Sequence, residues 1–190
     1  MRSDTSAKQK TLDPLSIDAL AASAVRIRDM SLKEKEAVVD EIAILQPNLL
    51  ALVFVLNSLE VPIQKVDQVL HILLVLYDAF KRSMPEGIPM ISEDTMEAVD
   101  NNQMALLRLM DAEEPEEAAR LCRLATTSHP EINAFAYANG TLRDAGMYDA
   151  KKQDEFYCIR AVRNLVDVFS RTRRAQPEKP AGGNLKAIAL

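Results

Sequence analysis

The sequence predicts an all-α protein, folded as a helical bundle of about eight helices. The composition favours helix, because Leu, Ala, Val, Glu and Arg dominate while only 5 glycines and 5% aromatic residues are present. Apolar residues recur at the three- and four-residue spacing of an amphipathic helix. Prolines and capping residues divide the chain into segments of helical length. With 190 residues and 48% hydrophobic residues, the chain can bury a sizeable core.

Capping residues and a proline predict where the first two helices begin. Residues 1–12 are a polar N-terminal lead, which we expect to be flexible. Asp13 and Pro14 predict an N-cap and a first-turn proline for a helix that reaches about residue 29. Ser31 and Glu34 match the S-x-x-E capping box and predict a second helix through Leu45.

The segment 48–82 predicts a central, highly apolar helical hairpin. Its first helix contains Leu49–Leu56, a run without a polar residue, and its second begins after Pro62. A helix without a polar face is packed on all sides or is covered by another subunit. Two such helices in a small domain favour a homodimer with an isologous twofold interface, although a monomeric core is the alternative.

The C-terminal half begins after a loop over residues 83–91, where Pro and Gly exclude helix. Ser92 predicts the cap of a fifth helix, and Pro115 the first turn of a sixth. Ser128 and Glu131 match a second capping box, which predicts a seventh helix closed by Gly146.

We expect the eighth and longest helix over about residues 148–174. Residues 13–175 are thus predicted to form a single all-α domain with a candidate sub-boundary at 83–91. The Pro-, Gly- and Lys-containing segment 176–190 is predicted to be a flexible C-terminal tail.

The fourth predicted helix carries the weak candidates for a metal or acid–base site. Asp67, His71 and Asp78 lie four and seven residues apart, so they project from nearly one side of the helix. A carboxylate beside an imidazole can orient a general base or begin a metal site. The favoured alternative is a solvated stripe on an otherwise buried helix. The sequence contains no catalytic motif, so we expect no catalytic residue and no cofactor.

Charge is distributed unevenly, although the net charge is only −5. The acidic surface is predicted at Glu93, Asp94, Glu97, Glu113, Glu114, Glu116 and Glu117. A basic strip that binds a partner or an anion is predicted on one arc of the last helix, at Lys152, Arg160, Arg163, Arg171 and Arg174. Asp167 stands four residues from both Arg163 and Arg171, so part of this strip is alternatively self-paired.

These features predict a non-enzymatic cytoplasmic adaptor or regulatory protein that binds a protein partner and forms a homodimer. No apolar run reaches the length that crosses a bilayer, and the two cysteines lack metal or redox spacing. One alternative is a nucleic-acid-associated regulator that uses the basic last helix, although the acidic net charge makes nucleic acid a less expected partner. The other is a metal- or ligand-dependent enzyme centred on His71.

Overall fold

The computed structural model describes residues 12–175, so the predicted lead and tail lie almost wholly outside the described residues. Within this range the protein is all-α, with eight helices and no strand, which confirms the predicted fold class. The helices are α1 (Ile17–Asp29), α2 (Leu32–Leu45), α3 (Pro47–Ser58), α4 (Ile63–Ser83), α5 (Glu93–Asp111), α6 (Pro115–Thr127), α7 (Ile132–Asp144) and α8 (Gln153–Ala175).

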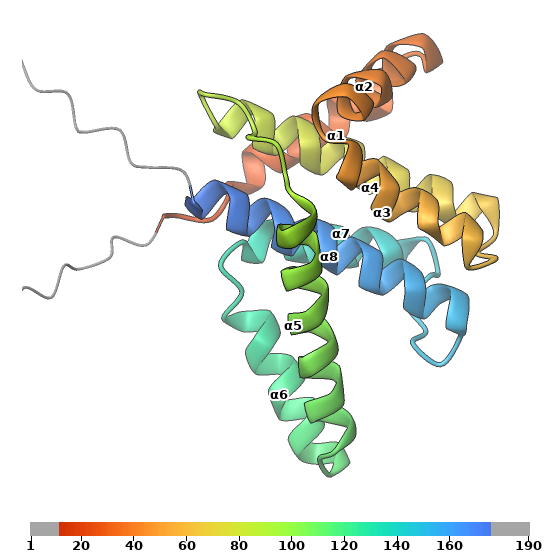
Figure 1. Cartoon of the computed structure of the whole chain (residues 1–190), viewed down its shortest axis with the longest axis vertical. Helices are drawn as coiled ribbons and strands as arrows, with labels where there is room; N and C mark the ends of the chain where they lie inside the picture. The colour runs from red at the N-terminus through yellow and green to blue at the C-terminus, as the bar shows by residue number, and fades with distance from the viewer. Residues whose placement is uncertain (1–11, 176–190) are drawn as a thin grey trace, which may run out of the picture.

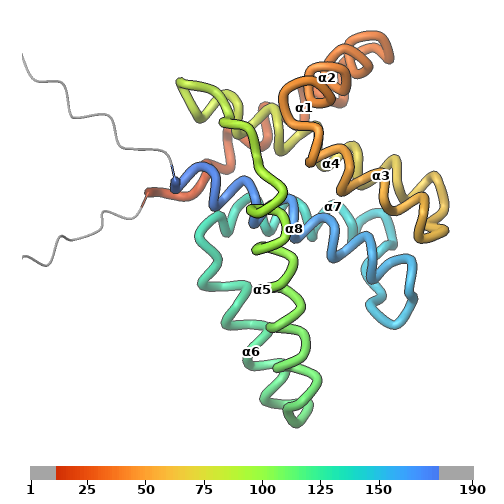
Figure 2. Tube along the Cα trace, viewed as in Figure 1, coloured from red at the N-terminus to blue at the C-terminus, as the bar shows by residue number. Residues whose placement is uncertain are grey.

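Helices α4 and α8 form the centre of the bundle. Figure 1 shows α3, α4, α7 and α8 lying alongside one another, and α1 packs against α4. The hairpin of α5 and α6 projects from this body, and the base of α5 packs on α8 (Figure 2). Helix α2 extends from another corner and packs chiefly against α3. The molecule therefore has a packed body and two less covered arms.

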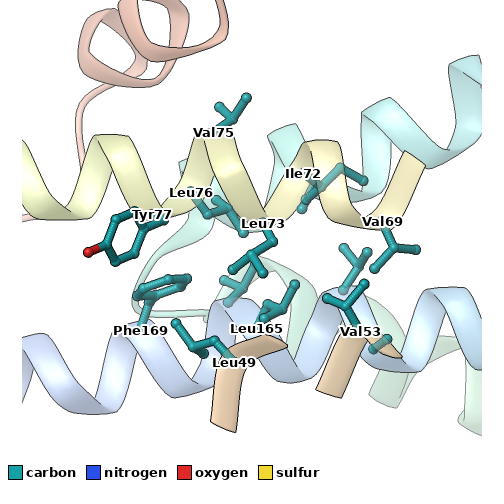
Figure 3. Packing of buried hydrophobic residues seen from close by; sticks show 14 of the residues in the cluster. Leu49, Val53, Val69, Ile72, Leu73, Val75, Leu76, Tyr77, Leu165 and Phe169 are labelled. Atoms are coloured by element: carbon teal, nitrogen blue, oxygen red, sulfur yellow. The ribbon is translucent and has the colours of Figure 1, made fainter. Parts of the chain in front are cut away.

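The core is densest between α4 and α8. Every residue from Ile72 to Phe80 in α4 is buried, so this helix has no solvent face over that stretch. Figure 3 shows Leu73 of α4 and Leu165 of α8 pointing toward each other, with Leu49 of α3 beside them. Burial of this apolar surface is the main favourable contribution to folding.

Helix α3 of the predicted hairpin keeps one side open. Leu49, Val53 and Leu56 are buried against the body, whereas Phe54 and Val55 are 46% and 49% exposed. An uninterrupted apolar helix cannot direct all its side chains into one interface, because they are distributed around its circumference. A single chain therefore covers α3 only in part.

Several predicted helix ends are confirmed. The Ser31 hydroxyl accepts the Glu34 amide, and the Glu34 carboxylate accepts the Ser31 amide at 2.7 Å, which completes the capping box. Ser92 caps α5, and Pro115 is the first residue of α6. Gly146 follows α7 with a φ of +68°, the left-handed conformation that favours glycine.

The start of α1 differs from the prediction at Asp13 and Pro14. The N-cap is Ser16, because the preceding residue is tied to a distant part of the chain. The Leu15 amide donates to the buried carboxylate of Glu131 at 2.7 Å. A long-range hydrogen bond thus keeps residues 13–16 out of the helix.

The capping box predicted at the start of α7 is wrong. Ser128 instead ends α6, where its hydroxyl donates to a carbonyl of the preceding turn. The N-cap of α7 is Glu131, without a side-chain capping bond, because its carboxylate binds Leu15 and Arg173. The sequence pattern of a capping box is present, but Glu131 binds residues that are distant in sequence and does not cap the helix.

Helix α8 begins five residues later than predicted, at Gln153 rather than residue 148. The buried Glu155 accepts the Asp149 amide at 2.8 Å, and this bond holds the preceding turn outside the helix. Between residues 12 and 175, no single helix combines the length and hydropathy that a bilayer crossing requires. Helices α2 and α3 pass that test only as a pair, across a bend of 112°.

Candidate functional site

Several residues of the predicted basic strip bind other side chains of the same chain and are not free to bind a partner. Arg160 of α8 forms an ion pair with Asp100 of α5. Its Nε donates to Oδ1 at 3.0 Å, and its Nη2 donates to both carboxylate oxygens. Burial raises the pKa of Asp100, but hydrogen bonds from Arg160 and Asn164 outweigh this, so the pKa lies below its usual value. This pair joins the acidic α5 to the basic α8 within one molecule.

Two other members of the strip also have intramolecular partners. Lys152 donates to Glu155 at 3.2 Å, and the Arg163 Nη2 donates to the Tyr148 hydroxyl at 3.2 Å. The guanidinium of Arg163 also lies over the ring of Phe135. The strip is therefore not a continuous row of free cations.

The predicted pairing of Asp167 with its neighbours on α8 is wrong. Its carboxylate instead accepts the Gln103 amide at 3.0 Å and faces the His129 Nε2 at 2.8 Å. Arg171 and Arg174 are exposed at the end of α8, and neither makes an ion pair within residues 12–175. These two are the exposed residues of the predicted strip that have no ion pair within the described residues, since the exposed Lys152 pairs with Glu155.

The predicted acidic surface is divided between the two ends of the α5–α6 hairpin. Glu113, Glu114 and Glu116 are exposed at its tip, where Glu117 pairs with Arg120 at 2.6 Å. The base of the hairpin carries the remaining predicted acids, Glu93, Asp94 and Glu97, all exposed. Of these acids, only the three at the base line cavities: Glu93 and Glu97 line one, and Asp94 lines another.

The cavity that Glu93 and Glu97 line is an open groove of about 490 Å³ between α3, α5 and α8. Its apolar walls include Leu52, Val55 and Leu56 of α3, Leu59 just after that helix, Met96 of α5 and Ala161 of α8. Of the two exposed residues of α3 described above, Val55 belongs to this wall and Phe54 does not line the groove. A concave apolar surface with a few polar groups is typical of binding sites.

The rim of this groove is acidic. Glu93 and Glu97 line it from α5, and neither forms an ion pair within the described chain. Asp100 also lines it, but Arg160 neutralises this carboxylate. The uncompensated charge beside the apolar walls is therefore negative.

Asn164 places a free acceptor at the groove. Its Nδ2 donates to Asp100 at 2.9 Å, which assigns the amide nitrogen because a carboxylate only accepts. The opposite atom, Oδ1, is buried and has no hydrogen-bond partner among the described residues. Because this oxygen is covered, it lies beneath the wall of the groove and not on its surface.

Two amide side chains fix the distance between the walls. The Gln46 Nε2 donates to the carbonyls of Ile88 and Pro89 at 2.9 and 3.0 Å, and its Oε1 accepts the Ile91 amide at 3.0 Å. Asn48 donates to the Ile91 carbonyl at 2.8 Å. The start of α3 is thereby bound to the segment that leads into α5.

Of the weak metal candidates, Asp67 and His71 line one open cavity between α2 and α4, whereas Asp78 does not. Asp78 is buried and pairs with Arg26 and Arg82, whereas Asp67 is exposed. His71 is half-buried, and desolvation with the nearby Lys35 lowers its pKa. No group of three or more His, Cys, Asp or Glu side chains in the described range could hold a metal ion.

A cysteine, a histidine and an aspartate meet beneath the hairpin but do not form a catalytic triad. Cys122, His129 and Asp167 line one cavity. The His129 Nδ1 accepts the Glu131 amide at 3.0 Å, so the ring proton is on Nε2, which faces Asp167. With both ring nitrogens engaged, the imidazole has no atom left to deprotonate the thiol.

Comparisons with known protein families, with curated proteins and with solved structures find no match. Sequence reasoning missed the groove because three separate helices form it. Two signals were present: the apolar run Leu49–Leu56 and the acids Glu93 and Glu97 at the start of another helix.

Proposed function

We propose that the protein is a non-enzymatic adaptor or regulatory protein that binds an amphipathic helix of a protein partner. The helix lies in the groove between α3, α5 and α8. The observation that carries this proposal is the apolar groove itself, walled by aliphatic side chains of α3 that the single chain leaves accessible. An amphipathic helix lays its apolar face into such a groove.

The charge of the rim specifies the partner further. Glu93 and Glu97 favour Lys or Arg flanking the apolar face of the bound helix. The proposed occupant is therefore a basic amphipathic helix.

A fluorescent peptide with leucines on one helical face and lysines beside them tests this proposal. We expect saturable binding by anisotropy and at least tenfold weaker binding of a peptide with the same composition but no apolar face. The matched variants are Val55→Ser inside the groove and Phe54→Ser outside it, because the two residues are adjacent and similarly exposed.

Val55→Ser should weaken peptide binding several-fold and Phe54→Ser should not. Glu97→Lys should also weaken it, whereas Glu113→Lys at the hairpin tip should have little effect. Equal effects of Val55→Ser and Phe54→Ser would contradict the groove as the binding site. Equal binding of an acidic peptide would contradict the proposed partner chemistry.

A homodimer is a second proposal, favoured by the exposed Phe54 on the side of α3 away from the groove. Sedimentation should then show a dimer that Phe54→Ser dissociates. If Val55→Ser dissociates the dimer instead, a second copy occupies the groove, and the proposal of a different partner there fails.

We further propose a cytoplasmic location, because Cys122 and Cys158 are both free thiols, as is usual in a reducing compartment. A nucleic-acid partner has less support. Arg160 is bound to a carboxylate, and the accessible basic residues of the strip are Arg171, Arg174 and the partly paired Lys152.

A further inference from the structure

A second cavity lies beneath the α5–α6 hairpin, where it meets α7 and α8. It is more enclosed than the groove and has a volume of about 170 Å³. Its apolar lining comes from four helices and includes Leu106, Met110, Ala125, Phe135, Phe156 and Ile159. Apolar cavities of about 150 Å³ stay dry and take up molecules of the size of benzene.

One cation on this cavity lacks a counter-ion. Arg163 lines it, is half-buried, and uses Nη2 to donate to the Tyr148 hydroxyl. No carboxylate lies within ion-pair distance of Arg163 among residues 12–175, and its Nε is buried without a hydrogen-bond partner. A guanidinium has five donors, so most of its capacity here is unused.

Asp167, one turn along α8 from Arg163, has other hydrogen-bond partners. Asp167 also lines the cavity, but it accepts from Gln103 and faces the Nε2–H of His129. Both donors are neutral side chains when the histidine carries one proton, so they hold the carboxylate away from Arg163 without cancelling the arginine charge. Arg163 therefore has no direct ion pair, although the carboxylate of Asp167 lines the same cavity, and a carboxylate that reaches the guanidinium would form one.

We propose that this cavity binds a small monocarboxylic acid with an apolar body of about one ring. The carboxylate engages the guanidinium of Arg163, whose planar fork matches it, and the apolar body fills the space between Leu106, Met110 and Phe156. This site is separate from the groove, so the inference does not rest on the proposed partner helix.

The packing of the hairpin fits such a ligand. Helix α6 has no buried residue, and its Leu121, Cys122 and Ala125 are only half-buried. Cys122 and Ala125 line the cavity and gain contacts when an apolar body fills it. Binding should therefore also stabilise the hairpin against the body.

Methionine methyl groups provide a reporter in each cavity of interest. Met110 lines the proposed site, Met96 lines the groove, and Met90 lines a third cavity at the end of α8. In the full chain with ¹³C-methyl methionine, phenylacetate should shift the Met110 signal saturably and leave Met96 and Met90 in place. The Met110→Leu variant assigns the signal.

Arg163→Gln should weaken phenylacetate binding about tenfold, whereas Arg171→Gln, on the same helix but outside the cavity, should not change it. Toluene, which lacks the carboxylate, should bind about tenfold more weakly than phenylacetate. If Arg163→Gln does not fold, Arg163→Lys keeps the charge without the fork and should still bind more weakly than the wild type.

Three outcomes would overturn the proposal: no shift of Met110 up to millimolar phenylacetate, equal binding of toluene, or binding that substitution of Arg163 leaves unchanged. Failure of this experiment leaves the peptide test of the groove unaffected, because the two sites have different reporters and different variants.

Discussion

Phe80 of α4 and Phe169 of α8 stack face to face, with ring centroids 4.8 Å apart and an angle of 6° between the ring planes. Both side chains are fully buried, 0% and 1% exposed. The contact joins the two helices that form the centre of the bundle. It therefore couples the N-terminal and C-terminal halves of the chain into one core.

Phe169→Ala should lower the free energy of unfolding by about 3–5 kcal/mol, because it removes a buried ring and leaves a cavity against Phe80. Urea denaturation measures the change. Phe169→Leu retains most of the volume and should cost less. Phe54→Ser, on the open side of α3, should stay within about 0.5 kcal/mol of the wild type.

Asp78→Asn should lower the free energy of unfolding by about 1–3 kcal/mol. The carboxylate is 3% exposed and pairs with Arg26 and Arg82, but these arginines are 43% and 57% exposed, so solvent screening reduces the cost. Asp67→Asn on the same helix is the matched control, since Asp67 is exposed. Equal costs at the two positions would show that the ion pairs of Asp78 do not stabilise the fold.

Local chemistry made the ends of many helices predictable. Ser31, Ser92, Pro115 and Gly146 act through residues within one turn, so the sequence alone identifies them. The start of α7 was not predictable in this way. Glu131 binds groups that are distant in sequence, and such pairings depend on the finished packing.

The stability of the protein should fall in acid partly through Glu155. Hydrogen bonds from the Asp149 amide and then from Lys65 lower its pKa to about 2. A carboxyl with a lowered folded-state pKa stabilises the fold above its unfolded pKa of about 4.3. That contribution is lost as the pH falls through the folded value, so it should decline between about pH 4.3 and 2.

Glu155→Gln therefore should lower the melting temperature at neutral pH, and the difference from the wild type should shrink toward pH 2. Thermal unfolding followed by circular dichroism across this range checks the sign. Glu116→Gln, at the exposed tip of the hairpin, is the control and should track the wild type throughout. A difference that grows on acidification would contradict the assigned role.

Glu60→Gly should stabilise the protein by about 0.5–1 kcal/mol. Glu60 follows α3 with a φ of +58°, a left-handed conformation that is unfavourable for a residue with a Cβ. Glu60→Ala keeps this Cβ and should give no comparable gain. Chemical denaturation of the two variants separates the backbone effect from loss of the carboxylate.

The α5–α6 hairpin should exchange its amide hydrogens faster than α4 and α8. Helix α6 has no buried residue and α5 buries only Val99, so opening the hairpin exposes little apolar surface. Hydrogen exchange read by mass spectrometry gives the comparison. Protection of α6 equal to that of α4 would mean that the hairpin unfolds only with the whole core.

The charge pattern of the sequence identifies the basic and acidic residues but not which of them pair. Arg160 and Asp100 lie on different helices, and their pairing follows from the way α5 crosses α8. The pairing expected for Asp167 within α8 was wrong because Gln103 and His129 compete for the same carboxylate. Spacing along one helix predicts neighbours on that helix only, whereas this site is built between helices.

The bonds of Gln46 have a consequence for sequence divergence. Gln46 recognises only main-chain atoms of Ile88 and Pro89, so these positions can mutate without loss of the contact. Replacement of Gln46 by Glu keeps the length but removes both donors. Homologues should therefore vary freely at position 89 and among apolar residues at position 88, since Ile88 also packs against the core, while they retain an amide at position 46. An exception at position 46 would mark a lineage in which the groove has a different width.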